Sequence, residues 1–117
     1  MKAILLAGGR GERLRPLTLT LPKCLAPVLG RPLLDYWWPF CRRAGIDEVL
    51  INVSHHHDQV LDYLARRGDD RPRVTVVHET APRGTAGTVL AERRFVEADE
   101  SFWILYSDNL VELDVMD

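Results

Sequence analysis

Cysteine is scarce in this chain, which has only Cys24 and Cys41 among its 117 residues. Two thiols without metal-ligand spacing do not make a disulfide framework, so the sequence excludes a disulfide-stabilised secreted domain. We expect both thiols to be buried or incidental rather than redox-active. Long apolar runs are also missing, since none approaches the roughly 20 residues of a membrane span. No cleavage site for export follows Met1. The sequence therefore predicts a cytoplasmic protein with no membrane partner.

Basic charge is scarce except at the N-terminal end. Six Lys or Arg and one acid lie in residues 1–31, whereas the remainder carries nine basic and sixteen acidic residues, which gives a net charge of −2. A nucleic-acid-binding protein is more often basic over a whole face or domain. The local excess instead favours a small anionic ligand, with no nucleic acid as partner.

The order of apolar runs and helix breakers predicts strands that alternate with helices. Strands are expected at 2–6, 48–53, 73–78 and 102–106, helices at 32–43, 58–67 and 85–95, and a long loop at 8–31. Such alternation predicts an α/β fold, a three-layer α/β/α sandwich with a mostly parallel Rossmann-like sheet and ligands at the carboxyl ends of the strands. Within the first helix, Trp37 and Trp38 are expected to pack on the sheet or a partner, and Pro39 to kink or end the helix.

The most informative segment joins a strand to a glycine-rich turn. Glycines let backbone N–H groups approach phosphate oxygens closely, and cations neutralise charge during phosphate transfer. The residues expected to bind nucleotide here are Leu6, Ala7, Gly8, Gly9 and Gly11. Leu14 replaces the third glycine of a dinucleotide fingerprint, no acid ends the second strand, and no P-loop motif is present. These absences argue against a nicotinamide enzyme and a P-loop NTPase.

Several spaced motifs resemble those of the sugar-phosphate nucleotidyltransferases, also called NDP-sugar pyrophosphorylases. They are LAGGxGxRLxPLT from Leu6, PKxLxPV from Pro22, GRPLL from Gly30, AGIDEV from Ala44, GTAG from Gly84 and the strand-end Asp108. Within the family, the motifs most resemble those of the members that transfer guanylyl to mannose 1-phosphate. The resemblance implies that a sugar 1-phosphate attacks the α-phosphorus of a nucleoside triphosphate, generally with Mg²⁺, and that pyrophosphate leaves.

The resemblance also implies roles for individual residues. Arg13 and Lys23 match the family's phosphate-binding cations and are the expected catalytic residues, the alternative being solvated surface charges. Asp108 matches a metal aspartate, the alternative being a turn cap. Glu79 lies five residues before Gly84, where the family reads the base, the alternative being an exposed acid at a strand end. Gly84, through its backbone, and Thr85 are also expected to bind the nucleotide. Because an ionised carboxylate only accepts hydrogen bonds, and guanine offers two adjacent donors, Glu79 favours GTP.

Two alternatives in function stay open. The chain could transfer uridylyl or thymidylyl to a glucose-type sugar 1-phosphate, or it could be a module that binds nucleotide without catalysis. Residues 1–117 are expected to be the nucleotide-binding N-terminal part of a nucleotidyltransferase domain, truncated before the sugar site and the second metal aspartate. The sequence leaves the oligomeric state open, a homo-oligomer included. The run from His55 to His57 is expected to be a solvated loop, because consecutive residues do not converge easily on one ion.

Overall fold

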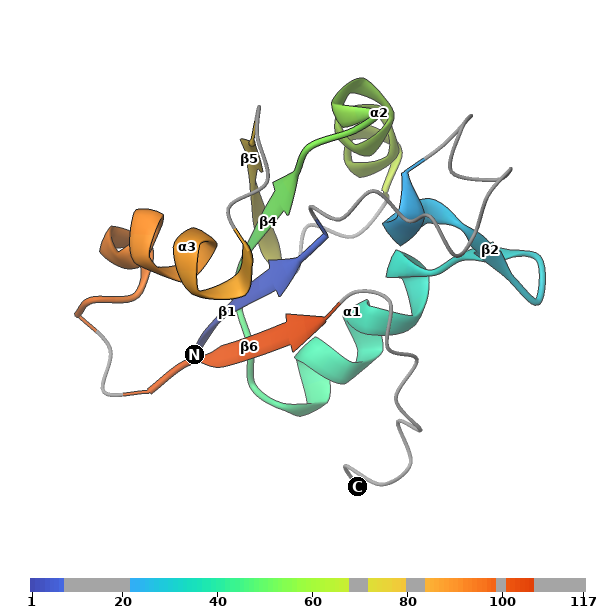
Figure 1. The fold of residues 1–117 in the computed structure, drawn as a ribbon. Helices are drawn as coiled ribbons and strands as arrows, with labels where there is room; N and C mark the ends of the chain where they lie inside the picture. The colour runs from blue at the N-terminus through green and yellow to red at the C-terminus, as the bar shows by residue number, and fades with distance from the viewer. Residues whose placement is uncertain (8–21, 68–71, 80–83, 99–100, 107–117) are drawn as a thin grey trace.

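The computed structural model describes residues 1–7, 22–67, 72–79, 84–98 and 101–106. Four parallel strands form its main sheet in the order β5-β4-β1-β6 (Figure 1). They are β1 (Lys2–Leu6), β4 (Glu48–Val53), β5 (Arg73–His78) and β6 (Trp103–Tyr106). All four strands lie where the sequence predicts them, and β6 begins one residue later than expected.

Helices cover both faces of this sheet (Figure 1). The connections from β1 to β4 and from β4 to β5 step in the same direction, so right-handed crossovers put α1 (Leu34–Arg43) and α2 (His57–Arg66) on one face. The return from β5 to β6 carries α3 (Gly84–Ala91) and η4 (Arg93–Phe95) across the other face. Two separate apolar clusters fill the space on the two sides. The predicted α/β/α sandwich is therefore confirmed.

The larger cluster lies under α1 and is rich in aromatic rings. The Trp37 ring meets the Phe40 ring edge-on at 5.5 Å between centroids, and Phe40 meets Trp103 in the same way at 5.6 Å. Such edge-to-face pairs add to the stabilisation from apolar burial. Trp37 and Trp38 are both buried in this cluster, which confirms that they pack on the sheet side of the helix.

The helix α1 continues to Arg43 through Pro39, so of the two effects predicted for the proline, a kink or an end of the helix, the end is wrong. Proline removes one backbone hydrogen bond from a helix interior. Buried side chains on both sides of it, Trp38 before and Phe40 and Cys41 after, hold the helix against the sheet and offset that loss. The helix ends at Arg43, and the glycine predicted to stop it follows the C-cap Ala44: Gly45 has a φ of +75°, which suits glycine.

The two thiols are buried, as predicted. Cys24 belongs to η3 (Lys23–Leu25) and Cys41 to α1, and both lie in the larger apolar cluster. Burial raises the pKa of each thiol from 9.0 to about 12, because the interior disfavours the charged thiolate. Both groups are therefore neutral and poorly nucleophilic near neutral pH.

Part of the expected loop at 8–31 is ordered structure. A short antiparallel hairpin pairs β2 (Pro27–Val28) with β3 (Arg31–Pro32). Its two turn residues, Leu29 and Gly30, both have positive φ, at 51° and 79°, which is the pattern of a type I′ turn. Such turns prefer Asn-Gly, so the leucine hid the hairpin from the sequence pattern. None of the helices in the described ranges has the length and apolar character to cross a membrane.

Candidate functional site

A buried polar network joins the carboxyl ends of three strands. Ala7 follows β1, Asn52 lies near the end of β4, and Glu79 follows β5, while Thr88 approaches from α3. The strand register puts Asn52 beside Leu6 on one side and Val77 on the other. The polar side chains therefore meet at the sheet edge where parallel α/β folds bind ligands.

Hydrogen bonds fix the orientation of each member of this network. The backbone N–H of Ala7 donates to Asn52 Oδ1 over 2.8 Å, so the amide nitrogen of Asn52 faces the other way. That nitrogen donates to Glu79 Oε1 over 3.0 Å. The Thr88 hydroxyl donates to Glu79 Oε2 over 2.7 Å. Each oxygen of the carboxylate thus has its own donor.

The three side chains are almost completely removed from solvent. Their exposed fractions are 4% for Asn52, 2% for Glu79 and 1% for Thr88. A buried carboxylate is costly unless hydrogen bonds satisfy it, and here they do. The alternative interpretation of Glu79 as an exposed acid at a strand end is therefore wrong.

The other residues predicted for the site fall into two groups. The structure places Leu6 at the end of β1, Lys23 at the first residue of η3, and Gly84 and Thr85 at the first two residues of α3. A helix N-terminus presents unpaired N–H groups, so the start of α3 is suited to an anion or a polar base edge. The remaining predicted site residues lie outside the described residues: Gly8, Gly9, Gly11, Arg13 and Asp108.

Asn52 and Thr88 are the members of the network that sequence reasoning missed. A signal for Asn52 was present, because it interrupts the apolar run of β4, which is buried along almost its whole length. A polar amide in such a strand needs hydrogen-bond partners inside the fold. Thr88 carries no comparable signal, since threonine is ordinary on a helix.

The histidine run only partly matches its prediction as a solvated loop. His55 is exposed, whereas the ring of His57 stacks on that of His78 at 4.5 Å and 9° between planes. The solvated-loop interpretation is therefore wrong for His57, which joins the start of α2 to the end of β5. Among the described residues, no group of three or more His, Cys, Asp or Glu side chains is arranged to hold a metal ion.

Comparison with known proteins assigns this chain to a family. A family model described as nucleotidyl transferase matches residues 2–117. The chain belongs to the nucleotidyl transferase family. The resemblance drawn from the sequence motifs is thereby confirmed.

Curated relatives in this family are named for different substrates. The chain is 37% identical to mannose-1-phosphate guanyltransferase beta-B of Xenopus laevis, with 100% of this chain and 33% of the relative covered. It is 31% identical to a UTP–glucose-1-phosphate uridylyltransferase of Synechocystis, with 98% and 32% covered. The chain thus spans about a third of the length of these relatives.

Solved structures agree on the fold. A UDP-glucose pyrophosphorylase from Acinetobacter baumannii superposes with a TM-score of 0.80 at 22% identity, over 92% of this chain and 45% of the other. The CTP:phosphocholine cytidylyltransferase LicC from Streptococcus pneumoniae gives a TM-score of 0.70 at 27% identity, over 97% and 49%. This chain therefore shares its α/β/α sandwich with enzymes that are named for different substrates.

Proposed function

We propose that the protein containing this chain transfers a nucleotidyl group, most favourably guanylyl from GTP, to a mannose- or heptose-type sugar 1-phosphate. The products are an NDP-sugar and pyrophosphate. The observation that carries the proposal is the buried Glu79 carboxylate, held by Asn52 beside the strand from which the glycine-rich segment continues. The relatives named as mannose-1-phosphate guanyltransferases support it. The reaction takes place in the cytoplasm in this proposal, where triphosphates and sugar phosphates are available.

Positioning and charge neutralisation are the chemistry that such a transfer needs. Backbone N–H groups of Gly8, Gly9 and Gly11 bind the phosphates in this proposal, and the Arg13 guanidinium contacts them in bidentate fashion. Lys23 supplies a compact positive charge between the two reacting phosphates. Each group stabilises negative charge that grows as the bond to pyrophosphate breaks.

Mg²⁺ is the cofactor in this proposal, and Asp108 is the residue proposed to hold it. Hard oxygen ligands suit Mg²⁺, which proteins commonly bind through one or two carboxylates together with substrate phosphates. When bound, Mg²⁺ supplies neutralisation of phosphate charge.

The proposed base preference rests on the acceptor chemistry of Glu79. A carboxylate only accepts hydrogen bonds, and its oxygens here accept from Asn52 and Thr88. In this proposal the carboxylate also accepts from the adjacent ring N–H and amino group of guanine, whereas uracil and thymine offer one donor flanked by acceptors. The uridylyl alternative has its own support in the Synechocystis relative named as a uridylyltransferase.

Glu79→Gln tests this preference without emptying the network. The new amide oxygen still accepts from Asn52, and the Thr88 hydroxyl rotates to accept from the new amide nitrogen, so we expect the fold to persist. GTP, UTP and dTTP binding to the chain and to the variant is measured by calorimetry, with Glu97→Gln as an exposed control. Losing a hydrogen bond to a charged group costs about 1.5–3 kcal/mol, so the preference for GTP should fall by roughly tenfold or more. Preference of the unmodified chain for a pyrimidine would refute guanylyl transfer.

Pyrophosphate release tests catalysis separately from binding. The isolated chain is expected to bind nucleotide weakly and to turn over little substrate, because it spans about a third of its relatives. In the full-length enzyme, Lys23→Ala and Arg13→Ala should each lower turnover by orders of magnitude. Near-normal turnover in either variant would remove that residue from the proposed site.

A further inference from the structure

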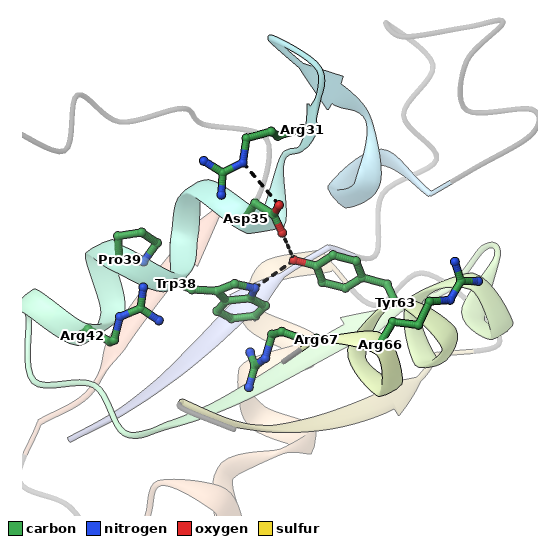
Figure 2. Close-up of a pocket in the computed structure, with 8 residues that line it drawn as sticks. All are labelled: Arg31, Asp35, Trp38, Pro39, Arg42, Tyr63, Arg66 and Arg67. Atoms are coloured by element: carbon green, nitrogen blue, oxygen red, sulfur yellow. Dashed lines mark hydrogen bonds and ion pairs between the residues drawn. The ribbon is translucent and has the colours of Figure 1, made fainter. Parts of the chain in front are cut away.

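A pocket lies away from the strand-end network, in the groove between α1 and α2. Its volume is about 420 Å³, within the roughly 300–1,000 Å³ of small-molecule sites. No member of the Asn52–Glu79–Thr88 network lines it. Four arginines do, with Trp38 and Tyr63 between them (Figure 2). They are Arg31, Arg42, Arg66 and Arg67.

The floor of the pocket is held in place by a chain of hydrogen bonds. Trp38 Nε1 donates to the Tyr63 hydroxyl over 2.9 Å, and that hydroxyl donates to Asp35 (Figure 2). Burial, together with the hydrogen bond to Asp35, raises the pKa of Tyr63, so the phenol remains a neutral donor. The Arg31 Nε lies 3.5 Å from the other oxygen of Asp35. The acidic group of the pocket is thereby engaged by Tyr63 and Arg31.

Two contacts also hold the Arg67 side chain in place. Its guanidinium lies 4.6 Å from the centroid of the Trp38 ring, in a cation–π contact. Its Nη2 donates to the carbonyl oxygen of Pro72 over 2.6 Å. A guanidinium anchored on two sides gives up little side-chain freedom when an anion arrives.

The charge around this pocket is positive in a chain whose net charge is negative. Four arginines line the pocket together with Asp35, and Asp62 pairs with Arg66 at its side. Counting both aspartates leaves two positive charges, whereas the whole chain carries −2. Like charges gathered in a partly buried groove repel one another, and a bound dianion relieves that repulsion.

We propose that this groove is a binding site for a phosphate group, either free or carried by a small organic molecule. Arginine is well suited to such a group, because its planar fork donates two parallel hydrogen bonds to phosphate oxygens. Arg42 and Arg31 are the exposed contacts, Arg67 is the anchored one, and the rings of Trp38 and Tyr63 give an apolar wall for an organic moiety. Nothing in this inference depends on the reaction proposed for the strand-end site.

Calorimetric titration of the chain with inorganic phosphate and, separately, with glycerol 3-phosphate tests the site and distinguishes the two sources. Arg42→Gln and Arg31→Gln should each weaken binding about tenfold or more, the scale of one lost hydrogen bond to a charged group. Arg43→Gln is the matched control, because Arg43 is the next residue of the same helix turn and does not line the pocket. Lys23→Ala is a second control, because Lys23 is a proposed phosphate contact of the strand-end site and does not line the pocket. Thermal unfolding of each variant checks that it is folded.

Saturable binding of either probe that is lost in Arg42→Gln and kept in Arg43→Gln and Lys23→Ala would support the proposal. Tighter binding of glycerol 3-phosphate than of phosphate would identify a phosphorylated metabolite as the source, and the reverse order would identify free phosphate. Absence of binding by both probes would overturn the proposal. Equal weakening by Arg43→Gln, or loss in Lys23→Ala, would also overturn it, because the anion would then respond to general charge or occupy the other site.

Discussion

Asn52→Asp is the substitution that most directly tests the buried network. It preserves the shape of the side chain and the oxygen that accepts from the N–H of Ala7. It replaces the nitrogen that donates to Glu79 Oε1 over 3.0 Å with a second carboxylate oxygen. Two buried carboxylates at that separation repel, so one of them must take up a proton or the site must open.

The cost follows from the contacts that change. A hydrogen bond to a charged group is worth about 1.5–3 kcal/mol, and each pKa unit of repulsion adds about 1.4 kcal/mol. We expect a loss of roughly 3 kcal/mol of unfolding free energy at pH 7, a large part of the 5–15 kcal/mol typical of a domain. With urea slopes of about 1–3 kcal/mol/M, the midpoint should fall by roughly 1–3 M.

The loss should shrink as the pH is lowered. Repulsion raises the pKa of the new carboxyl group in the folded state above its unfolded value of about 3.9. Its protonated form restores a donor to Glu79, so the variant approaches wild-type stability below that unfolded pKa. The deficit then grows as the pH rises through the folded pKa. Urea unfolding followed by fluorescence of the three tryptophans, repeated at several pH values, measures this dependence.

A second substitution separates the network from general disruption of the core. Glu79→Gln combined with Asn52→Asp exchanges donor and acceptor, because the new amide donates to the new carboxylate while its oxygen accepts from Thr88. The double variant should be more stable than the sum of the single effects predicts, by about 2 kcal/mol. An Asn52→Asp midpoint equal to that of wild type at pH 7, or additive effects in the double variant, would refute the hydrogen-bond assignment.

Two further predictions concern stability outside the network. Because burial raises the pKa of Cys24 and Cys41 to about 12, their contribution to stability is complete below the ordinary thiol value of 9.0 and is lost as the pH rises towards 12. Urea unfolding should therefore show stability falling over that range, with a shallower fall in Cys41→Ala; an equal slope in that variant would argue against it. Leu29→Asn should stabilise the hairpin by up to about 1 kcal/mol, since Leu29 has φ +51° and is 93% exposed. A lower urea midpoint would show instead that Leu29 makes a stabilising contact.

The strands were predictable because of the kind of sheet they form. A parallel sheet covered by helices on both faces buries its inner strands, so β4 (Glu48–Val53) reads as a nearly continuous apolar run. The glycine at position 45 was a sequence signal for the end of α1, and the structure shows why, since Gly45 has a positive φ. Those signals are local and need no knowledge of what the strands pack against.

The hairpin was hidden for the opposite reason. Each of its strands, β2 and β3, has two residues, too few to show an alternating pattern. Pro27 pairs with Pro32, and proline ordinarily argues against a strand. Tertiary contacts hold it instead, including the hydrogen bond from the Tyr36 hydroxyl to the carbonyl oxygen of Val28 over 2.6 Å.

The strand-end site shows where sequence motifs stop being informative. The motif residues are grouped along the chain, so a phosphate-binding segment and a base-reading acid were visible as separate signals. Their connection depends on β4 lying between β1 and β5, which only the sheet order reveals. A residue near the end of that strand is the one placed to touch both neighbours, and Asn52 bonds to Ala7 on one side and Glu79 on the other. Any change at Asn52 is therefore felt simultaneously at the start of the glycine-rich segment and at the proposed base contact. A change at Thr88 acts on both Glu79 and Asn52, because its hydroxyl donates to Glu79 and accepts from Asn52 Nδ2 over 3.4 Å.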